Sequence, residues 1–281
     1  MNTLHVLILA LVQGFGELLP VSSSAHVIMT EKLLGLNPSA PEMTMLLVML
    51  HTGTMFAVIA YFWRSWGRTY FASPEAFRRN GLNVVVATGA TGVVGLALLH
   101  LIKALVAKNR PDFEIEELFG NTKIIAAGLA TAGLLILYSS RSAKAKGGEV
   151  TGLSALLIGA VQGLCLPFRG LSRSGATISA GLSLGVGRRF AEQFSFALAV
   201  VLTPVVVAKE AYRLFKTPAA ASAIHTGDAW TLVLPSLLGM SLSFAAGLVA
   251  LRWLSDWLET DRWYLFGFYC LAASLLVLVL G

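Results

Sequence analysis

Long apolar runs recur along the whole 281-residue chain, and they restrict its fold more than any other feature. A helix needs about 20 consecutive apolar residues to cross the hydrocarbon core of a bilayer. Only 13% of the residues are charged, whereas soluble domains carry about a quarter. We therefore predict an all-α polytopic membrane protein that forms one integral membrane domain over residues 1–281. The expected full spans are residues 43–63, 82–106, 118–138, 194–215, 230–253 and 263–280.

Two further apolar stretches are interrupted by polar and turn-forming residues. They cover residues 4–34 and 153–185, and each contains Pro, Gly and Ser near its middle. Irregular polar backbone at membrane depth is tolerated only where it is buried in protein or lines a cavity. Each stretch is therefore predicted to be a re-entrant or broken-helix hairpin.

The two interrupted stretches resemble each other. Each opens with Val-Gln-Gly, at residues 12–14 and 161–163, and continues with a Leu-Pro step and a Ser-rich turn. Each precedes three expected spans, so the chain is predicted to contain an internal repeat, residues 1–140 and 150–281. Because a unit with three spans ends on the other side of the membrane, the second copy is expected to be inverted. The two polar turns are then expected to meet near the middle of the membrane.

The basic residues predict how the chain is oriented. The net charge of +6 would suggest a nucleic-acid partner in a soluble protein, but here no nucleic acid is expected, because the basic residues lie in short loops. Cytoplasmic loops of membrane proteins carry an excess of Lys and Arg. The loops assigned to the cytoplasm lie within residues 64–79, 141–146, 188–189 and 252–262. The acidic loop 111–117, a mildly basic loop near Lys216, both termini and the mouth of the first hairpin are then expected outside.

The second turn carries an anion-binding pattern. Ser172 is placed to cap the helix that follows, and free N–H groups at a helix N-terminus favour an anion. Arg173 adds a planar guanidinium that can bind two phosphate oxygens at once, and a charge in the middle of a membrane segment is functional by default. Ser174 and Thr177 add hydroxyl groups one turn apart. Together these residues predict a phosphate-binding site.

The first turn supplies groups that can react. Gln13 and Glu17 are four residues apart and share one helix face, where Glu17 is expected to act as a base or as a ligand of a divalent cation. Ser22 or Ser23 is expected to cap the second arm of the hairpin. His26 is expected to be the nucleophile or base, with Ser23 as the alternative nucleophile. A reactive set that faces an anion site predicts phosphoryl transfer.

Other polar residues within the apolar segments are expected to be structural. His51 and His100 are interpreted as packing residues. Ser24 and Ser183 are interpreted as hydroxyl groups that bond back to a backbone carbonyl.

The two polar turns resemble the signature motifs of a known family. The stretch from Gln13 to His26 is similar to the first signature of bacterial undecaprenyl-pyrophosphate phosphatases of the bacitracin-resistance type, and Ser172 to Thr177 is similar to their second signature. The resemblance extends over essentially the whole chain. It implies hydrolysis of undecaprenyl pyrophosphate to undecaprenyl phosphate and inorganic phosphate, which recycles the lipid carrier for peptidoglycan and other wall polymers and confers bacitracin resistance.

The resemblance also implies a cofactor, a location and site residues. The cofactor is a divalent cation, Mg²⁺ or Ca²⁺, and the location is the bacterial inner membrane, with the active site open to the periplasmic or outer face. By matching position, Ser22 and Ser172 join the substrate-binding residues. Gln13 stands where Glu is commoner, and the match implies that Gln13 joins Glu17 as a weaker metal ligand or base. Arg169 stands where the second signature has Pro and is expected to add a second cation for the pyrophosphate.

A transporter or flippase for lipid phosphate is the alternative function. Inverted repeats with broken helices are typical of transporters, and the same anion site could carry a phosphate headgroup across the membrane. The expected partners are a polyprenyl pyrophosphate and membrane lipids, and the sequence is compatible with a homodimer. Glu17 and His26 favour the enzyme, because a carrier needs an anion site but no nucleophile.

Overall fold

The computed structural model describes residues 2–37, 40–107, 121–142, 147–215 and 229–280 of the chain. Within these ranges the chain forms helices and no β-strand, apart from one isolated bridge between Gly148 and Val186. The prediction of an all-α protein is therefore confirmed. The acidic loop 111–117 and the loop near Lys216 lie outside the described residues.

The helices divide into two sets of the same layout. The first half contains α1 (Thr3–Leu18), α2 (Ser23–Leu33), α3 (Pro41–Thr69), α4 (Pro74–Ala107) and α6 (Thr122–Ser142). The second half contains α7 (Gly152–Cys165), α8 (Arg173–Ser183), α9 (Arg188–Phe215), α11 (Ala229–Glu259) and α12 (Tyr264–Leu280). In each half, two short helices precede three longer ones, as predicted for a hairpin followed by three spans.

The long helices make this a multi-pass membrane protein. Five of them, α3, α4, α6, α9 and α11, are long and apolar enough to cross a bilayer. The sixth predicted span is α12, which has 17 residues. That length lies at the lower limit of about 17 residues for a membrane-spanning helix.

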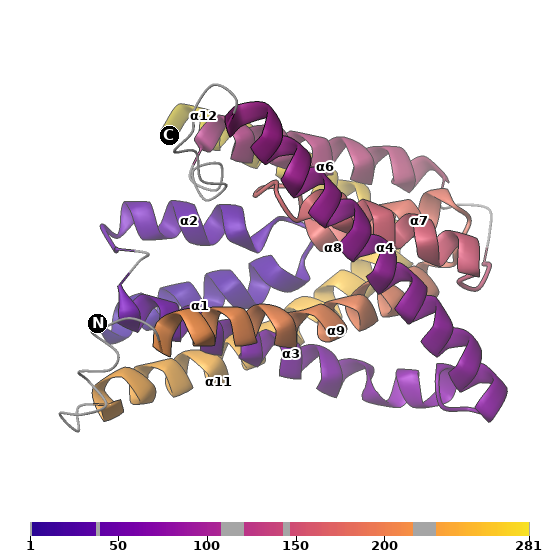
Figure 1. Ribbon diagram of the computed structural model, residues 1–281, viewed down its shortest axis with the longest axis horizontal. Helices are drawn as coiled ribbons and strands as arrows, with labels where there is room; N and C mark the ends of the chain where they lie inside the picture. The colour runs from indigo at the N-terminus through magenta and orange to yellow at the C-terminus, as the bar shows by residue number, and fades with distance from the viewer. Residues whose placement is uncertain (1, 38–39, 108–120, 143–146, 216–228, 281) are drawn as a thin grey trace.

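Both predicted interruptions are confirmed. The first hairpin breaks between Leu18 and Ser23, and the second between Cys165 and Arg173. Proline lacks the backbone N–H that would continue a helix, and one proline lies in each break, at positions 20 and 167. In Figure 1, α1 and α2 lie side by side as one hairpin, and the turns of the two hairpins approach each other in the middle of the molecule.

The first helix of each hairpin packs on a long helix of the other half. Helix α1 packs against α11, and α7 packs against α4. The glycine of each Val-Gln-Gly motif permits this close approach: a Cβ at Gly14 would lie 2.6 Å from the Ala246 Cβ, and a Cβ at Gly163 would lie 2.9 Å from the Thr91 carbonyl oxygen. The reciprocal packing accords with a duplicated unit, while its inverted symmetry stays a prediction.

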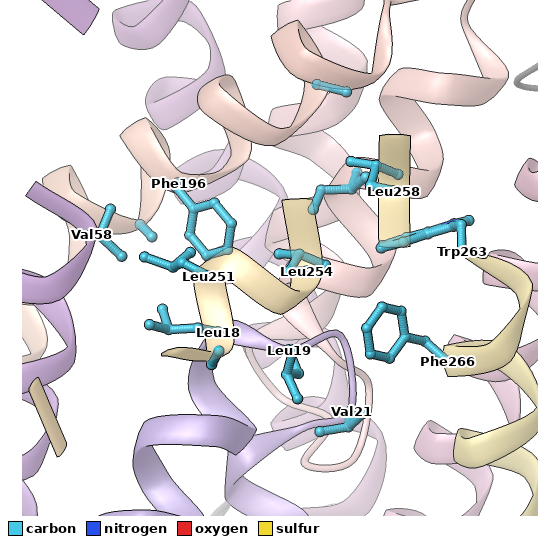
Figure 2. Packing of buried hydrophobic residues seen from close by; sticks show 14 of the residues in the cluster. Leu18, Leu19, Val21, Val58, Phe196, Leu251, Leu254, Leu258, Trp263 and Phe266 are labelled. Carbon is cyan, nitrogen blue, oxygen red and sulfur yellow. The ribbon is translucent and has the colours of Figure 1, made fainter. Parts of the chain in front are cut away.

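A hydrophobic core lies directly under the first turn. Leu18, Leu19 and Val21 of this turn belong to the same buried cluster as Leu254 and Phe266. Figure 2 shows these residues together, with side chains from α3, α9, α11 and α12 around the turn. The core therefore fixes the irregular backbone that carries the polar residues of the first hairpin.

Ion pairs join the basic turns that the sequence assigns to the cytoplasm. Arg79, near the start of α4, pairs with Glu149 at 2.8 Å. Arg188, at the start of α9, pairs with Asp261 in the α11–α12 turn. In Figure 1 the start of α1 and the end of α12 lie on the opposite side of the molecule from the α3–α4 turn.

Candidate functional site

The two turns together enclose a polar cavity of about 190 Å³. Both hairpins contribute to its lining, and α3 adds one side chain. The polar residues that line it are Glu17, Ser22, Ser23, Ser24, His51, Gln162, Arg169, Ser172, Arg173 and Ser174. The expectation that the two turns meet is therefore confirmed.

The Glu17 carboxylate lies at the centre of this cavity. Arg173 donates from Nη2 to Glu17 Oε1 at 2.6 Å, and the two side chains are only 23% and 16% exposed. Ser23 Oγ donates to Glu17 Oε2 at 2.6 Å, and Gln13 Nε2 donates to the same oxygen at 3.3 Å. In a largely desolvated place the guanidinium compensates the carboxylate charge. The pair also ties the end of α1 to the start of α8.

The serine that contacts Glu17 sits on an unusual turn. Ser22 has φ 68° and ψ 91°, in the left-handed region that non-glycine residues rarely occupy, and Ser23 begins α2 directly after it. Such backbone strain is concentrated at functional sites. Ser22 makes no side-chain cap bond, so the expected cap is not found there. Ser172 does cap its helix, because its Oγ accepts from the Gly175 N–H at 3.2 Å.

The predicted phosphate-binding residues fall into two groups. Ser172, Arg173, Ser174 and Arg169 line the cavity, as predicted for residues that bind substrate. Thr177 does not: its hydroxyl is fully buried, donates to the Arg173 carbonyl at 2.8 Å and hydrogen-bonds the α9 residue Ser195 at 2.6 Å. The geometry gives Thr177 a role in holding α8 on α9, and its predicted contact with phosphate gains no support.

His26 lies away from the reactive set. Its Nδ1 donates to the Ser22 carbonyl at 2.9 Å, and its Nε2 hydrogen-bonds the Tyr269 hydroxyl at 2.7 Å. The two rings stack with centroids 5.7 Å apart. His26 lines two apolar grooves beside α12 rather than the polar cavity. Because both ring nitrogens of His26 are engaged elsewhere, the geometry gives the expected His26 nucleophile no support and favours the alternative, Ser23, which bonds to Glu17.

Three polar residues of the cavity were missed by the sequence reasoning: His51, Gln162 and Ser24. Ser24, interpreted as bonding back to a backbone carbonyl, lines the cavity with its Oγ 3.3 Å from the Ser22 Oγ. His51, interpreted as a packing residue, lines the cavity with Nε2 at 3.9 Å from Glu17 Oε2. An ionisable residue in the middle of a span is functional by default, so the rule applied to Arg173 also identifies His51. Gln162 is fully buried and lines the same cavity. Its place in the second Val-Gln-Gly motif, matching Gln13, was the available signal.

Glu17 and Gln13 by themselves do not fit a divalent cation. Mg²⁺ and Ca²⁺ take about six to eight oxygen ligands. Both Glu17 oxygens already accept hydrogen bonds, one of them from the Arg173 guanidinium, and Gln13 directs its amide N–H at the same carboxylate. Across the described ranges, no group of three or more His, Cys, Asp or Glu side chains could hold a metal ion.

Comparison with known proteins assigns the chain to a family. A family model described as bacitracin resistance protein BacA matches residues 6–276. The chain belongs to this family. A relative from Acinetobacter baylyi named undecaprenyl-diphosphatase 2 is 59% identical over 281 residues, which cover 100% of this chain and 99% of the relative. Relatives named undecaprenyl-diphosphatase are 31% identical in Fusobacterium nucleatum, covering 98% of this chain and 99% of the relative, and 31% identical in Korarchaeum cryptofilum, covering 100% of both.

Proposed function

We propose that the protein hydrolyses undecaprenyl pyrophosphate to undecaprenyl phosphate and inorganic phosphate. The names of its full-length relatives support this substrate. The main structural support for hydrolysis is the Ser23 hydroxyl, which donates a hydrogen bond at 2.6 Å to the Glu17 carboxylate, and this carboxylate is paired with Arg173. The reaction recycles the lipid carrier of wall polymers and gives resistance to bacitracin.

In the first step, Ser23 Oγ attacks the terminal phosphorus and Glu17 Oε2 accepts the hydroxyl proton. The bond between this phosphorus and the bridging oxygen breaks, and undecaprenyl monophosphate leaves with the bridging oxygen and the proton from Glu17. In the second step, water attacks the phosphoserine and gives a proton to Glu17, which returns it to the departing Ser23 oxygen. Inorganic phosphate is released, and the starting state is restored.

The second hairpin stabilises the charge that develops on the transferred phosphoryl group. Arg173 binds its oxygens, together with the hydroxyl groups of Ser172 and Ser174 and the N-terminus of α8. Arg169, which lines the same cavity, offers a further positive charge to the lipid-linked phosphate. Arg173 thereby performs two tasks, because it also orients the Glu17 base.

A divalent cation is proposed to reach the site on the diphosphate rather than on the protein. Phosphate oxygens are ligands that Mg²⁺ accepts readily, and Glu17 and Gln13 supply too few oxygens alone. The cation, when bound, neutralises part of the diphosphate charge. Removal of divalent cations with EDTA is therefore expected to lower activity through the KM for substrate, while the folded state of the protein is unchanged.

The protein is further proposed to lie in the inner membrane with the cavity open to the outer face. The support is the distribution of charge: the basic turns are joined by ion pairs at one end of the molecule. Positively charged loops favour the cytoplasm. The mouth of the first hairpin, between the start of α1 and the end of α2, then faces outwards.

Phosphate release by the purified protein in detergent tests the function. Wild type is expected to release inorganic phosphate from undecaprenyl pyrophosphate, and Glu17→Gln is expected to lower kcat about 10²–10⁴-fold, the usual contribution of a general base. A folded wild-type protein that binds the lipid without releasing phosphate would contradict the proposal and would favour the alternative function, a transporter or flippase for lipid phosphate. The relatives give that alternative no support.

A further inference from the structure

The polar cavity adjoins two larger cavities of different chemistry. One, the apolar groove, has a volume of about 530 Å³, and its lining includes Phe15, Gly16, Trp253, Trp257, Phe266 and Tyr269. The other, the polar vestibule, has a volume of about 500 Å³, and its lining includes Gln13, Glu31, Lys32, His51 and Arg169. Both volumes fall in the range of about 300–1,000 Å³ that is usual for small-molecule sites.

Gly16 lies at the boundary between the polar cavity and the apolar groove, because it lines both. It directly precedes Glu17, and a Cβ added to it would lie 2.9 Å from the Ser23 Cα. The reactive groups are therefore one residue away from the groove. A second apolar groove, along α2 and α12, shares no lining residue with the polar cavity in the part of the chain that the structure describes.

Aromatic side chains form much of the apolar groove. The Trp253 and Trp257 rings meet edge to face with centroids 4.9 Å apart, and the Trp257 and Phe266 centroids are 5.0 Å apart. Figure 2 shows Phe266 beside Leu19 and Val21 of the first turn, which line the same groove. These surfaces offer hydrocarbon contact that begins at the catalytic turn and continues to α11 and α12.

The polar atoms that His26 and Tyr269 bring to the groove are already satisfied. Their mutual hydrogen bond of 2.7 Å uses the His26 Nε2, and the Ser22 carbonyl takes the other ring nitrogen at 2.9 Å. A hydrocarbon chain can lie against this pair without leaving a buried donor or acceptor unpaired.

The polar vestibule also has apolar side chains in its lining, Leu36 and Leu47 among them, but it contains charged side chains that the apolar groove lacks. Glu31 is only 3% exposed, and its Oε1 is buried with no hydrogen-bond partner among the described residues. Its carboxylate interacts electrostatically with Arg169, and Lys32 lines the same space. A hydrocarbon chain here would displace water from the charged groups of Lys32 and Arg169, at high cost. The vestibule therefore suits water and inorganic phosphate rather than a lipid tail.

We propose that the apolar groove binds the first isoprene units of the polyprenyl chain while the diphosphate occupies the polar cavity. This inference rests on the proposed function and adds the site that recognises the lipid. The chain passes Gly16, where a side chain would meet Ser23, and then lies against Trp253, Trp257 and Phe266. The remainder of the chain extends into the bilayer, and the vestibule stays open to water and phosphate.

Chain-length dependence tests this assignment. Trp253→Ala and Leu11→Ser each remove apolar surface from the groove at a side chain that is 41% exposed. The KM for undecaprenyl pyrophosphate is expected to rise about tenfold in each, as for the loss of one large buried apolar contact. The kcat/KM for methyl diphosphate, which has no isoprene unit and leaves the groove empty, should be unchanged, which also shows that the site is intact. Trp63→Ala, at an exposed tryptophan of α3, is the matched control and should alter neither.

Three results would overturn the assignment. The first is an unchanged KM for the long substrate in both groove variants. The second is a selective rise of that KM in Leu36→Ser, because Leu36 lines the vestibule and the chain would then run there. The third is an equal loss of kcat/KM on the long and short substrates, because a site that recognises the tail affects the long substrate alone.

Photocrosslinking gives a second measurement that does not depend on hydrolysis. Undecaprenyl phosphate with a photoreactive group in its first isoprene unit is irradiated with the purified full-length protein, and the adducts are mapped by mass spectrometry. Adducts are expected between Trp253 and Tyr269, and adducts between Leu36 and Leu47 would overturn the groove. A wild-type protein that gives groove adducts but releases no phosphate would contradict the proposed hydrolysis and leave the groove assignment standing.

Discussion

At the scale of single residues, the Glu17 carboxylate holds the candidate site together. One oxygen accepts from Arg173 and the other from Ser23, both at 2.6 Å. Hydrogen bonds that involve a charged group are roughly twice as strong as neutral ones. Because the two charges come from different hairpins, removal of either one leaves the charge of its partner largely buried and uncompensated, and it also removes the ion pair that joins the two turns.

Arg173→Lys keeps the charge but removes the planar guanidinium. We expect kcat to fall about 10²–10³-fold, as when one donor to the developing charge is lost, because an ammonium cannot bind Glu17 and the phosphoryl oxygens with the same fork. Steady-state phosphate release measures the effect. Arg79→Lys, whose guanidinium pairs with Glu149 far from the cavity, is the matched control. Full activity in Arg173→Lys would remove Arg173 from the proposed mechanism.

The sequence was enough to find most residues of the site but not the directions of their side chains. Ser23 and His26 lie one turn apart, yet Ser23 faces Glu17 and His26 faces Tyr269. The direction depends on a turn with positive φ at Ser22 and on a partner 243 residues along the chain, and neither is visible in a local motif. His51 could have been predicted as a site residue, because the argument that an ionisable residue inside a span is functional applies to an imidazole as it does to a guanidinium.

At the scale of elements, close packing between helices positions the second hairpin. A Cβ at Gly159 of α7 would overlap the Ala87 backbone of α4. Thr91 Oγ1 donates to the Gly159 carbonyl at 2.9 Å and accepts from Gln162 Nε2 at 3.1 Å. Small residues allow this approach in membrane helices, and hydrogen bonds across the contact fix its register. The position of α7, and so of the turn that follows it, depends on this contact with α4.

Gly159→Ala is expected to destabilise the protein by about 1–3 kcal/mol, the usual cost of overpacking. The thermal unfolding midpoint in detergent should fall, and phosphate release should fall with it, because α7 leads into the catalytic turn. Gly92→Ala on α4 is the control, since a Cβ there meets nothing within 4 Å. Equal midpoints for Gly159→Ala and wild type would show that the contact can relax and does not position the hairpin.

The lengths of the apolar runs predicted which segments are helices, but they predicted the first and last residues of those helices less well. The span expected at residues 43–63 is helix α3, which continues to Thr69, and the span expected at 82–106 is α4, which begins at Pro74. A hydrophobic pattern marks the part of a helix within hydrocarbon, whereas the helix itself continues into the headgroup region. Basic residues such as Arg68 favour a helix C-terminus there, and proline is well tolerated in a first turn.

At the scale of the whole molecule, the basic turns define one end. One ion pair, Arg79 with Glu149, joins the start of α4 to the segment before α7, and another, Arg188 with Asp261, joins the start of α9 to the α11–α12 turn. If this end is cytoplasmic, the start of α6 lies outside the cell with the mouth of the first hairpin. This orientation was predicted from the charges of the loops. Part of that charge pattern, including the acidic loop 111–117, lies outside the described residues.

Cysteine labelling in intact cells tests the orientation. In a background where Cys165 and Cys270 are replaced by Ala, Lys123→Cys at the start of α6 should react with a membrane-impermeant thiol reagent. Ala72→Cys and Thr260→Cys, in exposed turns at the basic end, should react only after the cells are permeabilised. The reverse pattern would place the cavity on the cytoplasmic face and contradict the proposed topology.

Phosphate release from undecaprenyl pyrophosphate by wild type, Ser23→Ala and His26→Ala, purified and assayed side by side, decides which residue reacts with the substrate. The proposed site predicts that Ser23→Ala loses turnover, because it removes the hydroxyl bonded to Glu17. His26→Ala should keep measurable turnover, since its ring faces Tyr269 and the apolar groove. An active Ser23→Ala beside an inactive, folded His26→Ala would contradict the account and restore His26 as the reacting group.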